Sequence, residues 1–197
     1  MSTTYYSGYT ACIGILLDRG ADIRSKDNLG VTALFAAHSH IECIRVLLDR
    51  GADTESKTNA GRTVLHQAAQ GHTECVKVLL DRGADIESME SQGGRALHLA
   101  VDQGHTACIS VLLDKGADIE SKNNLSVTAL LGAASAGYVQ CISELLDRGA
   151  DIDSRHKHGL TALLRAAHQG HIECIRLLLD RRAVIDEDKT QEVEHLE

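Results

Sequence analysis

Six cysteines recur along the chain at nearly constant spacing, and this periodicity constrains the possible folds more than any other feature. Each of the first five begins the pattern Cys, an aliphatic residue, two further positions, Leu-Leu-Asp, a basic residue and Gly-Ala-Asp. Repeats of 20 to 50 residues are typical of units that bury their apolar faces only by stacking on neighbouring copies. The cysteines lie 31, 32, 33, 33 and 33 residues apart, at Cys12, Cys43, Cys75, Cys108, Cys141 and Cys174.

Each copy predicts two helices joined by a tight turn. In the copy around Cys75, Thr63 is a favourable N-cap for a short first helix. The small residues Ala68 and Ala69 then allow a neighbouring helix to approach closely. A Gly-His turn follows, and from Cys75 onward the apolar residues have the period of a second helix. Gly83 supplies the left-handed residue that commonly ends a helix.

These units resemble the ankyrin repeat over residues 1 to about 187. The matching segments are Gly-Arg-Thr-Val-Leu-His at 61–66, Ala-Ala at 68–69, Gly-His at 71–72 and Gly-Ala-Asp-Ile at 83–86. The resemblance implies an all-α repeat fold, an ankyrin-type α-solenoid of stacked helix-turn-helix units with β-hairpin-like finger loops. The family's Thr-Pro-Leu-His opening never carries its Pro here, and its His occurs only at His66 and His98. Loss of that Pro should cost some stability without changing the fold.

A single array is expected over residues 1–187, followed by a C-terminal tail at 188–197. Gly8-Tyr9 aligns with the turn of the other copies, so the first copy is expected to begin within its first helix. One copy lacks a residue inside its first helix, which predicts a distorted start to that helix. The expected units are a partial repeat at 1–25 and full repeats at 26–56, 57–88, 89–121, 122–154 and 155–187.

Charge and hydropathy exclude several classes of partner. The chain carries 20 Lys and Arg against 28 Asp and Glu, a formal charge of −8, which would repel nucleic acid. It contains no run of about 18 to 20 apolar residues that could insert in a membrane. Residues 1–10 lack the basic and apolar regions of a secretion signal. We therefore expect an intracellular, cytoplasmic monomer whose partner is another protein.

Metal binding, cofactors and catalysis find little support in the pattern. Four copies place a His three residues before the Cys, which could form half of a zinc site. Equivalent residues on stacked helices lie about 8 to 10 Å apart, too far for a disulfide, and a structural zinc needs four converging ligands. We expect the cysteines to be small apolar core residues. No asymmetric nucleophile, base and third group, and no phosphate-binding loop, points to an enzyme.

Variation between the copies marks the candidate binding residues. It concentrates at the finger tips and on one side of the first helices, positions that line the partner-binding groove of ankyrin arrays. Four apolar candidates are expected to be exposed anchors, and the basic finger at 153–158 is expected to contact an acidic segment. Drift at solvent-exposed sites and a solvated loop remain alternatives. The candidates are Phe35, Gln67, Met89, Leu99, Asp102, Leu131, Arg165, His168, Arg155, His156 and His158.

The sequence thus predicts a non-catalytic protein-protein interaction module or scaffold that binds through a concave groove and its fingers. One alternative is a regulatory or targeting fragment of a larger enzyme or effector. Another is a designed repeat protein without a natural partner, which the near identity of the copies favours. Repeated free cysteines and unequal repeat lengths are unusual in designed arrays and favour the first interpretation.

Overall fold

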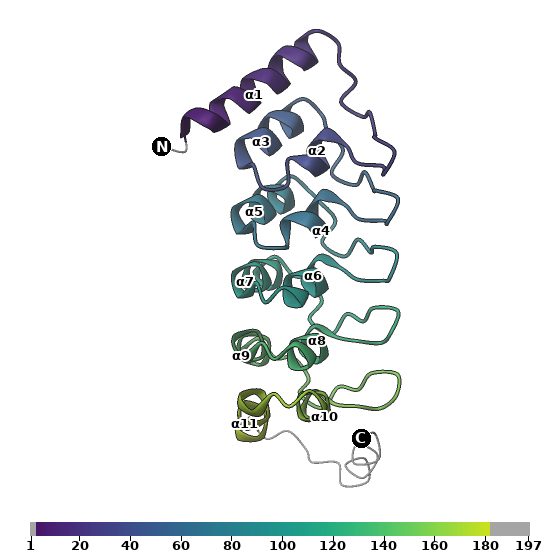
Figure 1. Ribbon diagram of the computed structural model, residues 1–197, viewed down its shortest axis with the longest axis vertical. Helices are drawn as coiled ribbons and strands as arrows, with labels where there is room; N and C mark the ends of the chain where they lie inside the picture. Colours follow the sequence, from purple (N-terminus) through teal and green to yellow (C-terminus); the bar gives the residue numbers. More distant parts are fainter. Residues whose placement is uncertain (1–2, 182–197) are drawn as a thin grey trace.

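Five consecutive helix pairs stack on one another below a single longer helix (Figure 1). The computed structural model describes residues 3–181, with side chains from residue 9 onward, and no strand occurs among them. Each expected full repeat contains one pair. The helices are α1 (Thr3–Asp18), α2 (Ala33–Ala36), α3 (Ile41–Asp49), α4 (Val64–Ala68), α5 (Thr73–Asp81), α6 (Ala96–Asp102), α7 (Thr106–Asp114), α8 (Ala129–Ala136), α9 (Val139–Asp147), α10 (Ala162–His168) and α11 (Ile172–Asp180).

The pairs form two layers with the core between them. We call α2, α4, α6, α8 and α10 the inner helices, because the finger loops project from their side of the stack (Figure 1). The remaining helices form the outer layer. On α7 the apolar face Cys108, Ile109 and Leu112 is fully buried, and the small pair Ala133 and Ala134 of α8 is buried as well. The predicted helix pairs and their apolar faces are therefore confirmed.

Four of the five inner helices begin directly after a Thr, as expected, whereas α6 begins after Arg95. The Oγ1 atom of Thr32 accepts a hydrogen bond from the backbone N–H of Phe35 at 3.2 Å. Thr128 caps α8 in the same way, through the N–H of Leu131. Such a bond satisfies one of the four N–H groups that a helix start leaves without a partner. These caps fix where α2 and α8 start relative to their fingers.

The fingers are tight backbone turns joined to one another. In the finger before α4, the N–H of Thr58 donates to the carbonyl of Arg62 at 3.0 Å, and the N–H of Gly61 donates to the carbonyl of Thr58 at 2.9 Å. The N–H of Asn59 donates to the carbonyl of Leu29 in the preceding finger at 2.9 Å. Adjacent fingers therefore hold each other in register without forming regular strands.

Ser126 is the one non-glycine residue with a positive φ, 57°, in the described part of the chain. It stands where another finger has Gly93, with a φ of 75°. A side chain in this region costs about 1 kcal/mol, so Ser126→Gly is expected to raise the free energy of unfolding by about 0.5 to 1 kcal/mol in urea denaturation. Gly93→Ser should do the reverse, because a Cβ there would clash with Oδ1 of Asn124. An unchanged or lowered stability of Ser126→Gly would contradict this account.

Two expectations about individual helices are wrong. No turn occurs at Gly8-Tyr9, because α1 continues through both residues. Continuing a helix adds one hydrogen bond per residue, whereas a separate helix of so few residues would need its own costly nucleus. In the copy with a residue missing, α2 starts normally on Thr32 and is instead cut short at its C-terminal end, after Ala36. The expected tail at 188–197 lies outside the described residues.

Candidate functional site

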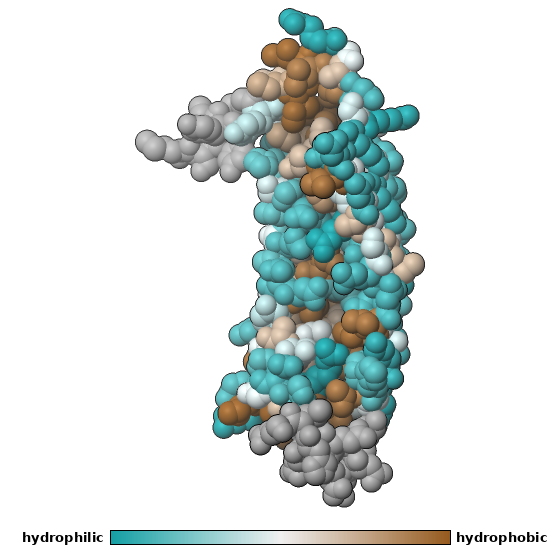
Figure 2. Space-filling model, turned by 45° about the vertical axis from the view of Figure 1, so that its right-hand side comes forward, coloured by the Kyte–Doolittle hydropathy of each residue, from teal (hydrophilic) through white to brown (hydrophobic). Residues whose placement is uncertain are grey.

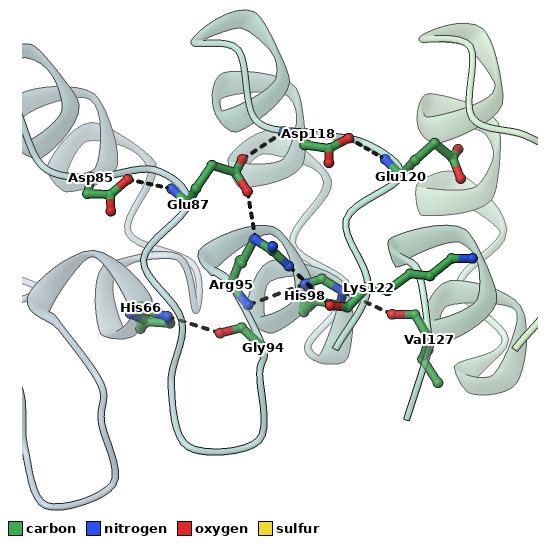
Figure 3. A network of polar contacts seen from close by, with 10 residues as sticks. All are labelled: His66, Asp85, Glu87, Gly94, Arg95, His98, Asp118, Glu120, Lys122 and Val127. Carbon is green, nitrogen blue, oxygen red and sulfur yellow. Dashed lines mark hydrogen bonds and ion pairs between the residues drawn. The ribbon is translucent and has the colours of Figure 1, made fainter. Parts of the chain in front are cut away.

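A network of polar contacts fixes the fingers to the inner helices (Figure 3). Glu87 accepts a hydrogen bond from the backbone N–H of Asp118, in the next repeat, at 2.8 Å. Its other carboxylate oxygen pairs with Nε of Arg95 at 2.6 Å. Arg95 in turn donates through Nη1 to the carbonyl of Lys122 at 3.1 Å. The surface formed by the inner helices and fingers, called the inner face below, is therefore held rigid from one repeat to the next.

Two buried histidines make equivalent links between repeats. The backbone N–H of Thr63 donates to Nδ1 of His66, so the proton of His66 is on Nε2, which donates to the carbonyl of Gly94 at 3.3 Å. His98 accepts at Nδ1 in the same way and donates through Nε2 to the carbonyl of Val127 at 3.0 Å. Burial lowers the pKa of both imidazoles, which outweighs the effect of these carbonyls. Both residues therefore have a structural role.

Nine of the eleven predicted binding residues lie at the surface. Of the apolar candidates only Met89 is exposed, with 52% of its surface accessible, and Phe35 is half-buried. The half-buried ones are Phe35, Gln67, His156 and Arg165, and the exposed ones are Met89, Asp102, Arg155, His158 and His168.

Leu99 and Leu131 are buried, so their prediction as exposed anchors is wrong. Leu131 is 0% exposed because it occupies the position that His66 occupies in α4, between one repeat and the next. Leu99 is 5% exposed and folds toward its own finger, with Cδ1 3.5 Å from where a Cβ of Gly94 would lie. Neither side chain is available as an anchor for a partner.

A small pocket of about 80 Å³ lies at the middle of the inner face, between α6 and α8. Its lining includes Arg62, Glu90, His98, Leu99 and Asp102. Asp102 is exposed as a whole residue, but the partial loss of water around its carboxyl in this pocket raises its pKa, against the opposing effects of His98 and Arg62. Because charges of both signs line this pocket, it has no clear preference for one sign of ligand.

A second pocket, of about 170 Å³, lies between α8, α10 and the basic finger, and we call it the C-terminal pocket. It brings together three predicted residues, His156, Arg165 and His168. Nη2 of Arg165 donates to Oγ of Ser135 on α8 at 3.2 Å. Burial lowers the pKa of Arg165, and burial followed by the charge of Arg165 lowers the pKa of His156. The C-terminal pocket is lined by Ser135, His156, Leu160, Arg165, His168 and Gln169, none of which is acidic.

Three of these lining residues were absent from the predicted site. Ser135 and Gln169 lie on the varying side of their helices, so variation between copies could have indicated them. Leu160 precedes the N-cap of α10, and nothing in the pattern of the chain marks it. Of the predicted finger residues, Arg155 and His158 do not line the pocket, although the His158 ring lies 5.2 Å from that of His156.

The cysteine thiols are free, and five of the six are buried as predicted. Burial raises the pKa of Cys75 to about 11, which leaves its thiol protonated and unreactive at neutral pH. Cys12 on α1 is exposed, contrary to the prediction that all six are core residues. Among the residues with described positions, no cluster of three or more His, Cys, Asp or Glu side chains could hold a metal ion.

Comparison with known families agrees with this architecture. The family described as "Ankyrin repeats (3 copies)" matches residues 1–90, 56–123 and 97–190, which together span nearly the whole chain. The chain belongs to the ankyrin repeat family. Ankyrin repeats are generally protein-protein interaction modules and are typically non-catalytic. No curated protein matches the chain. Within the described part of this ankyrin array, none of the helices combines the length and apolarity needed to span a membrane.

Proposed function

We propose that this ankyrin array binds a segment of another protein along its inner face and holds an acidic side chain of that segment in the C-terminal pocket. The observation that carries the proposal is the half-buried guanidinium of Arg165. Its polar contact within the described structure is the hydroxyl of Ser135, and no described carboxylate pairs with it. Removing a cation from water is costly unless a hydrogen-bonded anion compensates.

Several other basic residues of the array have such an anion. Arg50 pairs with Asp18 at 2.7 Å, and Lys115 pairs with Asp81 at 2.6 Å, each in the preceding repeat. Lys26 and Lys57 are exposed and donate to backbone carbonyls instead, so Arg165 differs from them in being half-buried. The planar guanidinium of Arg165 presents paired N–H donors that match a carboxylate, and His156 and His168 can add further donors.

The rest of the bound segment would lie along the inner face, toward the exposed Met89. From the C-terminal pocket, a bound segment would pass the middle pocket with Asp102 and then reach Gln67 and Phe35 on the first inner helices. Exposed polar groups around a few apolar contacts are typical of transient protein interfaces. Five buried free thiols fit a reducing compartment, so we place this interaction in the cytoplasm.

Peptide binding tests the proposal directly. A fluorescein-labelled Glu-Gly repeat peptide is expected to bind the array more tightly than its Gln-Gly counterpart in an anisotropy titration. Arg165→Gln should weaken binding of the Glu peptide at least tenfold, about 1.4 kcal/mol, and should remove most of the difference between the peptides. The matched control is Arg176→Gln, because Arg176 lies exposed on the outer helix α11 and pairs with Glu173.

Circular dichroism of both variants would show that the fold is retained. Equal binding of the Glu and Gln peptides to the wild-type chain would overturn the proposal. So would an Arg165→Gln variant that binds the Glu peptide as tightly as the Arg176→Gln control does.

A further inference from the structure

The C-terminal pocket and the middle pocket occupy the same place in successive repeats. The middle pocket lies between α6 and α8, and the C-terminal pocket lies between α8 and α10, so each is bounded by two stacked inner helices and the finger between them. A residue of one pocket can therefore be compared with its counterpart in the other. The counterparts that line both pockets are Asp102 and Ser135, Asn123 and His156, Val127 and Leu160, and Gly132 and Arg165.

Two of these exchanges change the charge of the pocket. Ser135 stands where the middle pocket has the carboxylate of Asp102. Arg165 brings a guanidinium to a position where the inner helices α4, α6 and α8 carry no cation. Between these counterparts, the C-terminal pocket therefore has one more cation and one fewer anion. The residues of α4, α6 and α8 at the position of Arg165 are Gln67, Leu99 and Gly132.

His156 keeps the backbone contact of its counterpart and adds a donor. Oδ1 of Asn123 accepts a hydrogen bond from a backbone N–H of its own finger at 3.1 Å. In the same way, Nδ1 of His156 accepts from the backbone N–H of Leu160 at 3.1 Å, so the proton of the imidazole is on Nε2. Two other fingers use a carboxylate for this contact, that of Asp27 or Glu90. His156 thus places a donor in the pocket where other fingers have only acceptors.

Further donors come from both helices of the pocket. The amide nitrogen of Gln169 lies 3.3 Å from Nδ1 of His168 and can only donate, so the proton of His168 is on Nε2 as well. The oxygen of Ser135 accepts from Arg165, which leaves the hydroxyl proton of Ser135 to be donated. Donors from α8, the finger and α10 therefore line one space that no acidic residue lines.

This donor set is larger than a carboxylate needs. A carboxylate has two oxygens, which the fork of a single arginine can satisfy. A phosphorylated side chain has three acceptor oxygens and about 1.5 to 2 negative charges at neutral pH. Burial lowers the pKa of His156, and the basic side chains of Arg165, His158 and Lys157 lower it further. Because such charges attract a dianion more strongly than a monoanion, the pocket favours phosphate over carboxylate.

We propose that the C-terminal pocket holds a phosphorylated serine or threonine side chain of the bound segment, with its phosphate between Arg165 and the Nε2 atoms of His156 and His168. This inference rests on the proposed function, since it names the acidic side chain that the pocket selects. Hydrophilic residues predominate on the finger side of the array (Figure 2), so polar contacts rather than a large apolar anchor are expected to fix the segment.

A phosphoprotein matches this surface better than a nucleic acid, which carries the same chemical group. The neighbouring middle pocket is lined by Glu90 and Asp102, and the chain has a formal charge of −8. A nucleic acid strand would bring a phosphate at every nucleotide against these acids. A protein segment with a single phosphate would place it only in the C-terminal pocket.

Peptides that differ in one residue test the inference. We would compare three fluorescein-labelled Gly-Gln repeat peptides that carry phosphoserine, Glu or Gln at the central position. In an anisotropy titration at about pH 7.5, the phosphoserine peptide is expected to bind about tenfold more tightly than the Glu peptide. The Glu peptide should in turn bind more tightly than the Gln peptide, and Arg165→Gln should weaken both acidic peptides.

The variant His156→Asn separates phosphate from carboxylate. Asparagine should keep the backbone contact that Asn123 makes in its own finger, and it removes the Nε2 donor of an imidazole that is neutral at this pH. It should weaken the phosphoserine peptide about fivefold and the Glu peptide less than about twofold. The matched control is Lys157→Asn, because Lys157 is an exposed cation on the same finger outside the pocket lining. This control should weaken phosphoserine binding less than His156→Asn does.

The possible failures can be told apart. A phosphoserine peptide that binds no more tightly than the Glu peptide would refute this inference and leave the proposed function standing. If neither acidic peptide binds more tightly than the Gln peptide, both are wrong. A larger loss in Lys157→Asn than in His156→Asn would show that the phosphate is attracted by the finger's charge and not held in the pocket. A short labelled single-stranded DNA that binds as tightly as the phosphoserine peptide would also contradict the assignment to a phosphoprotein.

Discussion

Replacing Leu131 with alanine is expected to lower the free energy of unfolding by about 2 to 5 kcal/mol. Leu131 is fully buried in α8, within the continuous core shared by all five helix pairs. Alanine would lose the transfer free energy of the missing atoms and would leave a cavity between repeats that the stack can close only in part. Urea denaturation followed by circular dichroism measures this loss.

The matched control is Leu125→Ala in the finger that precedes α8. Leu125 is 53% exposed, so its truncation should change the free energy of unfolding by no more than about 0.5 kcal/mol. If Leu131→Ala kept the wild-type free energy of unfolding and weakened peptide binding, Leu131 would be the exposed anchor that the sequence suggested. Its position in the core would then be wrong.

The fold could be predicted from the sequence because its repeated copies can be aligned with one another. Each outer helix repeats the same Cys, aliphatic and Leu-Leu spacing, and each inner helix follows a capping position such as Thr161. The wrong predictions concern α1, which has no inner helix beside it, and α2, whose copy lacks a residue. Helix α1 runs straight through Gly8 because no inner helix packs beside it, and alignment to fully stacked copies cannot show this.

The candidate site could be predicted only in part, because variation between copies is not the same as exposure. Finger residue His156 and helix residues Arg165 and His168 do meet in the C-terminal pocket. Leu131 varies as well, since other copies have His66 or His98 at that position, yet every one of these side chains is buried. Leucine fills this buried position by apolar packing, whereas histidine fills it and donates a hydrogen bond to the next finger.

Because this position is buried, His66 and His98 make the stability of the fold sensitive to acid. In the unfolded chain the pKa of a histidine is about 6.5, and burial lowers the pKa of His66 and His98 in the folded chain. The unfolded state therefore binds more protons at mildly acidic pH. The stability contributed by neutral His66 and His98 is present above about pH 6.5 and is lost as the pH falls through their folded pKa.

The double variant His66→Leu, His98→Leu is therefore expected to unfold with a free energy that depends less on pH between about 7 and 5. At pH 7 it should lose about 1 kcal/mol for each site, because the carbonyls of Gly94 and Val127 lose their imidazole donors. Urea denaturation at several pH values separates the two effects.

The reverse substitution, Leu131→His, tests the same effect of burial on a histidine pKa by adding a histidine at this position. It would aim an imidazole toward the carbonyl of Leu160, which occupies the position of Gly94 and Val127 in its own repeat. Because that imidazole would be buried, its pKa should also fall, and the loss of stability below about pH 6.5 should become steeper than in wild type. A double leucine variant with the wild-type pH dependence would show that acid acts on this array through other groups. One candidate is His72, whose pKa is lowered by burial and then by His38 and His105.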